Sequence, residues 1–94
     1  MKFEWNLRKA ATNKTKHGVS FEEALTVFAD GSAHIFDDIT HADFEPREII
    51  IGHSNRQRLL VVCFVERQDS VRIISARKAT QLERHDHEEG TRFQ

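Results

Sequence analysis

Cysteine, proline, tyrosine and long apolar segments are scarce in this sequence of 94 residues. The single cysteine, Cys63, excludes an internal disulfide, and its apolar neighbours in LLVVCFV (59–65) predict a buried thiol rather than a reactive thiolate. No run of residues approaches the roughly 20 apolar positions that a membrane-spanning helix needs. The N-terminus, MKFEWNLRKA, lacks the apolar centre of a secretion signal. We therefore expect a cytoplasmic protein.

Charge of either sign is nearly balanced, but the charged residues are unevenly distributed. The net charge is −1, yet residues 1–19 contain five Lys/Arg and one acid, residues 20–48 contain one base and eight acids, and residues 49–84 contain seven bases and three acids. Basic segments are typical of surfaces that meet phosphate groups, and also of ordinary solvated surfaces with mixed charge. The length fits a single domain spanning 1–94.

Helices are predicted in three places from their capping residues. The first follows Asn6, a residue typical of N-caps, and ends before Gly18, which fits the left-handed position after a last turn. The second begins with the capping box Ser20-x-x-Glu23 and carries apolar residues at helical spacing up to position 28. The third begins with a further capping box, T-x-x-E, at Thr80.

Strands are predicted between the second and third helices, joined by short polar links. Such links favour an antiparallel meander, and the uninterrupted apolar character of 59–65 favours a central strand. The fold class expected is α+β, with two N-terminal helices packed on an antiparallel meander sheet of 3–4 strands and a short C-terminal helix. The candidate strands are 33–36, 47–53, 59–65 and 71–76, with KFEW (2–5) as a further short strand.

No motif for a cofactor or metal ion is found. The sequence has no G-x-G-x-x-G, P-loop or G-x-S-x-G pattern, which excludes the common nucleotide and serine-hydrolase signatures. Its six histidines are scattered, and His85 and His87 are two positions apart, so a helix would direct them to different sides. We expect no metal and no cofactor. The acids of segment 37–45 predict a solvated loop.

Arginine and lysine are concentrated on and after the predicted strands. The planar arginine fork suits bidentate phosphate binding, and a basic sheet face suits an RNA backbone. Exposed aromatic side chains would add base stacking, and the candidates are Phe3, Trp5 and Phe44. Alternatively, the arginines pair with the chain's own carboxylates, for which the candidates are Glu45, Glu48, Glu66 and Glu83. Composition does not separate the two interpretations.

Several motifs resemble the BrnT family of bacterial type II toxins, which is similar in fold to RelE-type ribonuclease toxins. They are FEWN near the start, KHGVSFEEA (16–24), R-x-IIIGHS (47–54), RLLVV (58–62), RIISARKAT (72–80) and ER (83–84). The resemblance covers nearly the whole chain and implies a single RelE-like, BrnT-like toxin domain that cleaves mRNA and inhibits translation. It also implies a BrnA-like ribbon-helix-helix antitoxin, which would bind the toxin in a hetero-oligomer and make the contacts to operator DNA.

The resemblance leads to a hypothesis of metal-independent RNA cleavage, in which cations stabilise the charge on phosphorus and other groups transfer protons. Arg72 and Arg77 are predicted to stabilise charge. Arg47 and Arg84 would lie next to them. Lys78 and Arg58 are predicted to hold neighbouring phosphates, and His87 and His53 are the candidates for proton transfer.

Two features of the sequence bear on this hypothesis. Arg72 and Arg77 are five positions apart, so a regular strand would direct them to opposite faces unless a bulge or a strand end intervenes. In addition, His87 stands where the family usually has a tyrosine, and histidine titrates near neutral pH. The alternative function is a degenerate, non-catalytic toxin that binds its antitoxin and acts as a co-repressor.

Overall fold

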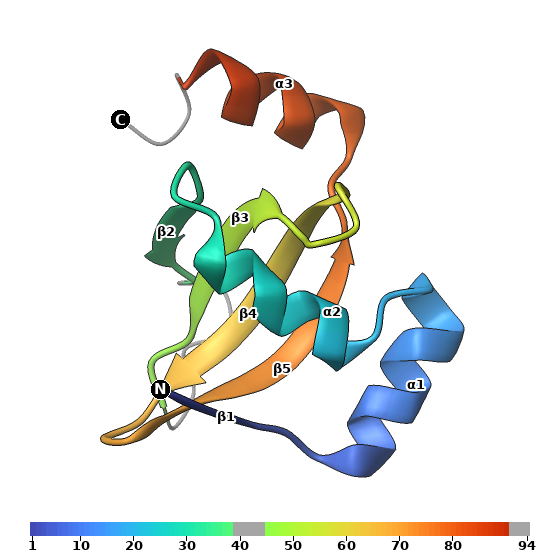
Figure 1. The fold of residues 1–94 in the computed structure, drawn as a ribbon, viewed down its shortest axis with the longest axis vertical. Helices are drawn as coiled ribbons and strands as arrows, with labels where there is room; N and C mark the ends of the chain where they lie inside the picture. Colours follow the sequence, from blue (N-terminus) through green and yellow to red (C-terminus); the bar gives the residue numbers. More distant parts are fainter. Residues whose placement is uncertain (39–44, 91–94) are drawn as a thin grey trace.

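Five strands form one mixed sheet in residues 1–38 and 45–90, which are the residues described by this computed structural model (Figure 1). The strand order is β1-β5-β4-β3-β2, in which β2 to β5 are antiparallel neighbours and β1 is parallel to β5. The predicted meander is confirmed, but the RelE-like sheet of 3–4 antiparallel strands is wrong. The strands are β1 Lys2–Glu4, β2 His34–Asp37, β3 Glu48–His53, β4 Leu59–Glu66 and β5 Ser70–Lys78.

Three α-helices and one 3-10 helix occur in the same described residues, namely α1 Leu7–His17, α2 Phe21–Leu25, η1 Thr26–Ala29 and α3 Gln81–Glu89. The second predicted helix is therefore divided, because α-helical bonding ends at Leu25 and a tighter 3-10 turn continues to Ala29. None of these helices has the length and apolar character that crossing a membrane requires.

The predicted helix ends are largely confirmed. The Asn6 side chain accepts a bond from the Lys9 N–H, and Gly18 has a φ of 70°, the left-handed conformation that glycine adopts without strain. Thr80 forms a complete capping box with Glu83. Only half of the expected box forms at Ser20, because the Glu23 carboxylate binds other partners, described below.

The main core lies between the sheet and the segment formed by α2 and η1, which covers one face of the sheet, while α1 lies beside the edge formed by β5 (Figure 1). Its sheet side comes from alternate residues of β4 and β5, including Leu60, Val62 and Ile73. Seven consecutive residues of β4 are buried, from Leu59 to Val65, which confirms the central-strand prediction. Phe3 and Trp5 pack into this core against Phe28 and Phe21, so these two aromatics are not the stacking surface expected.

A smaller apolar cluster lies on the opposite face of the sheet. It consists of Ile51, Leu59 and Val61, with Phe36, Ile49 and Ala79 packed against it. Helix α3 lies at the end of the sheet where β5 ends (Figure 1) and is attached by His87, which is buried against His34 of β2. This second face carries the pocket described next.

Candidate functional site: an arginine pocket on the open face of the sheet

A pocket with a volume of about 320 Å³ lies on the face of the sheet opposite α2 and η1. Its floor is the sheet itself, because Ile49 pairs with Cys63 and Cys63 pairs with Ser75 across three strands. Arg47, just before β3, and Arg77, near the end of β5, supply its positive charge. The lining residues are Asp38, Arg47, Ile49, Val61, Cys63, Ser75 and Arg77.

A bulge in β5 puts Arg72 and Arg77 on the same face of the sheet. Arg77 pairs with Val61 and Arg72 pairs with Val65, although a regular register from Val61 would reach Arg72 one residue later on β4. The shift falls between Cys63 and Phe64 and leaves one additional residue, Ile74, on β5. The bulge that the sequence required for a shared face is therefore present. The two arginines nevertheless lie toward opposite ends of β5.

Arg77 is held by a glutamate from α3. Its Nη1 and Nη2 donate to the two carboxylate oxygens of Glu83 at 2.8 and 2.9 Å. These bonds, with the N–H and hydroxyl of Thr80, lower the pKa of Glu83 to about 2, so this carboxylate is charged at neutral pH. The alternative interpretation is thus confirmed for Arg77. Its side chain nevertheless remains 41% exposed and lines the pocket.

Asp38 is the carboxylate of the pocket, and it is buried rather than solvated as the sequence predicted. Its backbone N–H donates to the Arg47 carbonyl at 2.9 Å, which joins the residue after β2 to the residue before β3. The Cys63 thiol lies 3.7 Å from Asp38 Oδ2. Burial and this carboxylate raise the pKa of Cys63 to about 11, so the thiol is protonated at neutral pH and the prediction of an unreactive cysteine stands.

Three other predicted cations lie outside the pocket lining. Arg72 donates to Glu4 of β1 at 3.1 Å. Lys78 pairs in register with Leu60, whose side chain lies in the main core, so Lys78 is directed to the other face from Arg77. Arg84 is exposed on α3.

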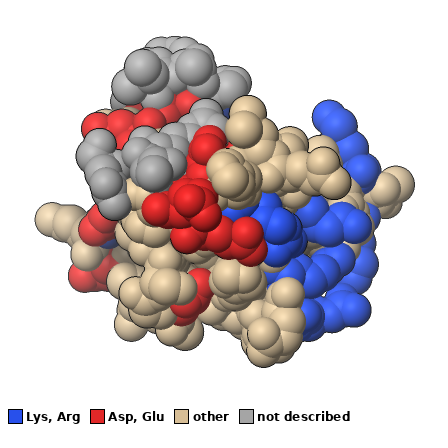
Figure 2. Space-filling model, turned by 90° about the horizontal axis from the view of Figure 1, so that it is seen from above, with Lys and Arg blue, Asp and Glu red and all other residues tan. Residues whose placement is uncertain are grey.

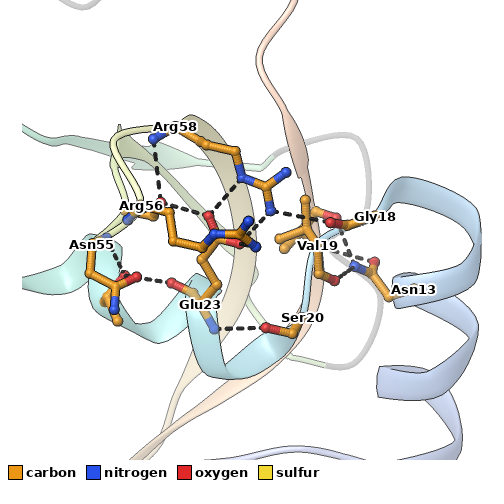
Figure 3. Close-up of polar contacts among 11 residues, drawn as sticks. Asn13, Gly18, Val19, Ser20, Glu23, Asn55, Arg56 and Arg58 are labelled. Carbon is orange, nitrogen blue, oxygen red and sulfur yellow. Dashed lines mark hydrogen bonds and ion pairs between the residues drawn. The ribbon is translucent and has the colours of Figure 1, made fainter.

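Arg58, the other predicted phosphate-binding residue, belongs to a polar network on the helix side (Figure 3). It binds both carboxylate oxygens of Glu23, and its Nη2 also donates to the Gly18 carbonyl at 3.1 Å. The Ser54 hydroxyl donates to Glu23 Oε2 at 2.6 Å. The bond from Arg58 is the main reason why the pKa of Glu23 is lowered. The structure therefore does not bring Arg58 into the pocket.

The predicted proton-transfer residues lie in a histidine cluster at the end of the sheet. His87 Nδ1 lies 3.1 Å from His34 Nδ1, and its ring centre is 6.0 Å from that of His53. Burial, and then the neighbouring His34 and His53, lower the pKa of His87. Within residues 1–38 and 45–90, no group of three or more His, Cys, Asp or Glu side chains is arranged to hold a metal ion.

Strand β3 packs closely against the segment of Asp30 and Ala33 next to this cluster. Asp30 Oδ2 accepts a bond from the His53 N–H at 2.7 Å, which contributes most to lowering the pKa of Asp30 to about 2. A Cβ at Gly52 would lie 2.7 Å from Ala33 Cβ, so only glycine allows this close approach.

Comparison with known proteins identifies the family. Residues 5–83 match the family model described as the ribonuclease toxin, BrnT, of type II toxin-antitoxin systems. The chain belongs to the BrnT family. A crystal structure of the Brucella abortus ribonuclease toxin BrnT is similar, with 28% identity and a TM-score of 0.66, and the match covers 86% of this chain and 99% of that one. No curated protein matched.

Asp38 and Ser75 are pocket residues that sequence reasoning missed. Asp38 stands in an acidic segment that reads as a loop, and Ser75 is one small polar residue within a strand. Neither type nor spacing marks them, and only the strand register would have placed them beside Arg77. Phe44, the remaining stacking candidate, lies outside the described residues.

Proposed function

We propose that this BrnT family member is a metal-independent endoribonuclease that cleaves mRNA and so inhibits translation. The observation that carries the proposal is the convergence of two arginines, Arg47 and Arg77, with the carboxylate of Asp38 in one pocket. Guanidinium groups bind phosphate oxygens through paired N–H donors, and they remain charged at all relevant pH values. A phosphate of the RNA would sit between them on the sheet floor.

The reaction would begin with attack of the RNA 2′-hydroxyl on the adjacent phosphorus. The O2′–P bond forms, the P–O5′ bond breaks, and the two arginines stabilise the negative charge that builds on the phosphate oxygens. Asp38 is the pocket carboxylate and would accept the proton from the 2′-hydroxyl. Water would supply the proton to the leaving 5′-oxygen. His53 and His87 lie outside the pocket lining, so this proposal moves proton transfer away from them.

Glu83 would position Arg77 until RNA arrives. Its two bonds fix the guanidinium plane at the pocket, and the RNA phosphate is an anion that competes for the same N–H groups. The partner in this proposal is a BrnA-like ribbon-helix-helix antitoxin, which would neutralise the toxin by binding it and would carry the contacts to operator DNA. Family membership itself implies a protein antitoxin.

A second candidate function is a degenerate toxin that binds its antitoxin without cleaving RNA. The observation that favours it is the Arg77–Glu83 pair, which already occupies the N–H groups that a phosphate would need. Under this alternative the pair remains closed, and the chain contributes only an interaction surface to a repressor complex.

Cleavage of end-labelled RNA in EDTA separates the two functions. The purified, antitoxin-free chain is incubated with RNA, alone and with ribosomes, beside the double variant Arg47→Ala/Arg77→Ala. Fragments from the wild type but not from the variant would support the endoribonuclease. Intact RNA with and without ribosomes would support the degenerate toxin, and cleavage that requires Mg²⁺ would contradict the metal-free reaction.

A further inference from the structure

A second hollow, with a volume of about 470 Å³, lies between α1 and the edge of β5. Its helix side is lined by Arg8, Lys9, Lys16 and His17, and its strand side by Ile74 and Ser75. We call it the α1 groove. Lys9 and Lys16 are seven positions apart, so they lie on the same side of α1, two turns from each other.

The cations of the α1 groove differ from the arginines of the sheet because they are not neutralised within the described chain. Arg58, Arg72 and Arg77 are each bound to a glutamate. Helix α1, in contrast, contains no acidic residue, and in residues 1–38 and 45–90 no ion pair involves its lysines or Arg8. Figure 2 shows Lys and Arg gathered on the side of the molecule where Figure 1 places α1. This surface is available to a polyanion.

The α1 groove adjoins the arginine pocket at Ser75. Ser75 lines both hollows, because its side chain shares the pocket face with Arg77 while β5 forms the edge of the sheet there. Strand β1 pairs with residues 70–72, and among the residues that the structure describes no other strand covers that edge beyond Arg72. A chain that leaves the pocket over Ser75 enters the groove directly.

The backbone edge of β5 beside the groove is not free to pair with a strand from another protein. The Asn13 amide donates to the Ala76 carbonyl at 2.8 Å and accepts from the Ala76 N–H at 3.1 Å. Both outward-facing groups of Ala76 are therefore satisfied, and a strand added to β5 would have to displace a buried side chain. Free cations and a blocked edge together favour a phosphate backbone over a polypeptide strand.

We propose that the α1 groove binds the sugar–phosphate backbone of single-stranded RNA beside the phosphate held in the arginine pocket. This inference rests on the proposed ribonuclease function and adds to it a second, sequence-independent contact. Phosphates outside the cleaved bond would be bound by Lys9, Lys16 and Arg8. These contacts position the RNA without selecting its bases. Three of the five basic residues in segment 1–19, namely Arg8, Lys9 and Lys16, gain a role that the pocket does not give them.

Salt-dependent RNA binding tests the groove without requiring cleavage. The full chain is titrated with a fluorescent, single-stranded RNA whose 2′-hydroxyls are blocked, at several salt concentrations. Lys9→Ala/Lys16→Ala is compared with Lys2→Ala/Lys14→Ala, a double variant that removes the same charge from exposed positions outside the groove. The slope of log K against log salt should fall by about 1.4 in the groove variant, from roughly 0.7 per lost contact on single strands, and stay unchanged in the control.

Each outcome either supports or overturns the groove. Equal slopes in the groove variant and the control variant would mean that RNA binding depends only on the total charge of the protein, which would overturn the proposed groove. Unchanged RNA binding with weakened antitoxin binding would assign the groove to a protein partner and also overturn it. If the wild type cleaves RNA while the groove variant binds normally, only this inference fails. If the wild type cleaves nothing but the slopes differ as expected, the groove stands and the proposed catalysis fails.

Discussion

Two arginine–glutamate pairs in this protein have the same chemistry and different surroundings. Arg58 binds Glu23 on the helix side, and Arg77 binds Glu83 on the pocket side. The Glu23 side chain is 4% exposed and also receives the Ser54 hydroxyl, while Arg58 is bound in addition to the Gly18 carbonyl. Arg77 is 41% exposed, and its guanidinium faces a cavity.

The difference shows that an arginine in an ion pair with glutamate does not always serve only to stabilise the fold. Around Arg58 every partner is supplied by the protein, so the pair joins α2, the β3–β4 turn and the start of β4. Around Arg77 one side is protein and the other is open space, so the pair holds a cation ready for a ligand.

Replacing Arg58 should cost most in stability. Arg58→Ala leaves the buried Glu23 carboxylate without its main partner, and such a loss lowers the free energy of unfolding by about 3 kcal/mol. For a domain of this size that lowers Tm by roughly 12–24 °C. Thermal unfolding followed by circular dichroism gives the value.

Arg56→Ala is the matched control, because Arg56 lies 3.7 Å from the same carboxylate but is 66% exposed. Its effect should stay within about 0.5 kcal/mol. Equal losses for Arg56 and Arg58 would contradict the structural role assigned to the buried pair.

Replacing Arg77 should act on activity instead. Arg77→Ala removes a charge that stabilises the transition state, so RNA cleavage should fall by about 100-fold or more, with a smaller loss of Tm than Arg58→Ala causes. Initial rates on end-labelled RNA measure the loss. Arg67→Ala is the control, since Arg67 is also 41% exposed and also bound to glutamates, at the β4–β5 turn. A comparable loss in the control would remove the distinction between the pocket and the rest of the surface.

Replacing Glu83 should tighten RNA binding by several-fold. Glu83→Gln keeps the shape of the side chain but removes the negative charge that competes with phosphate for Arg77. The gain is measured by fluorescence anisotropy with uncleavable RNA. Glu89→Gln, at an exposed position of the same helix, makes the same change of charge without touching Arg77 and should have little effect. Weaker binding after Glu83→Gln would mean that Glu83 only holds Arg77 in place.

The attachment of α3 should weaken in mild acid, and this is the smallest expected effect. The pKa of His87 is lowered in the folded protein, so the folded state favours neutral histidine. Its contribution to stability is therefore complete above the ordinary value of 6.5 and is lost as the pH falls through the lowered value. Urea unfolding at pH 7.5 and pH 5.5 measures the difference, which His87→Gln should reduce. An unchanged difference in that variant would place the titrating group elsewhere.

Local signals in the sequence were sufficient for much of the fold. Asn6, Gly18 and Thr80 act through bonds to residues a few positions away, so their roles were predictable from spacing. The parallel pairing of β1 with β5 joins residues about 68 positions apart, as in Phe3 with Val71, and no local pattern reports it. The bulge at Ile74 is likewise a property of two strands rather than of one.

The candidate site was predictable only in residue type. Arg58 and Arg77 look equivalent in the sequence, because each lies at one end of an apolar strand, Arg58 just before β4 and Arg77 near the end of β5. Their partners distinguish the two arginines: Glu23 is 35 positions from Arg58, whereas Glu83 is six positions from Arg77, although the sequence predicts both glutamates as capping-box residues. Burial of the pair and the cavity beside it become visible only after the strands are placed.

The most direct test observes the two guanidinium groups while RNA binds. The Nε–Hε signals of Arg58 and Arg77 are assigned by NMR with Arg→Lys variants and followed during titration with uncleavable RNA. The Arg77 signal should shift in step with binding, while that of Arg58 should stay in place. A shift confined to Arg58, or RNA binding that leaves Arg77 unchanged, would contradict the role assigned to Arg77.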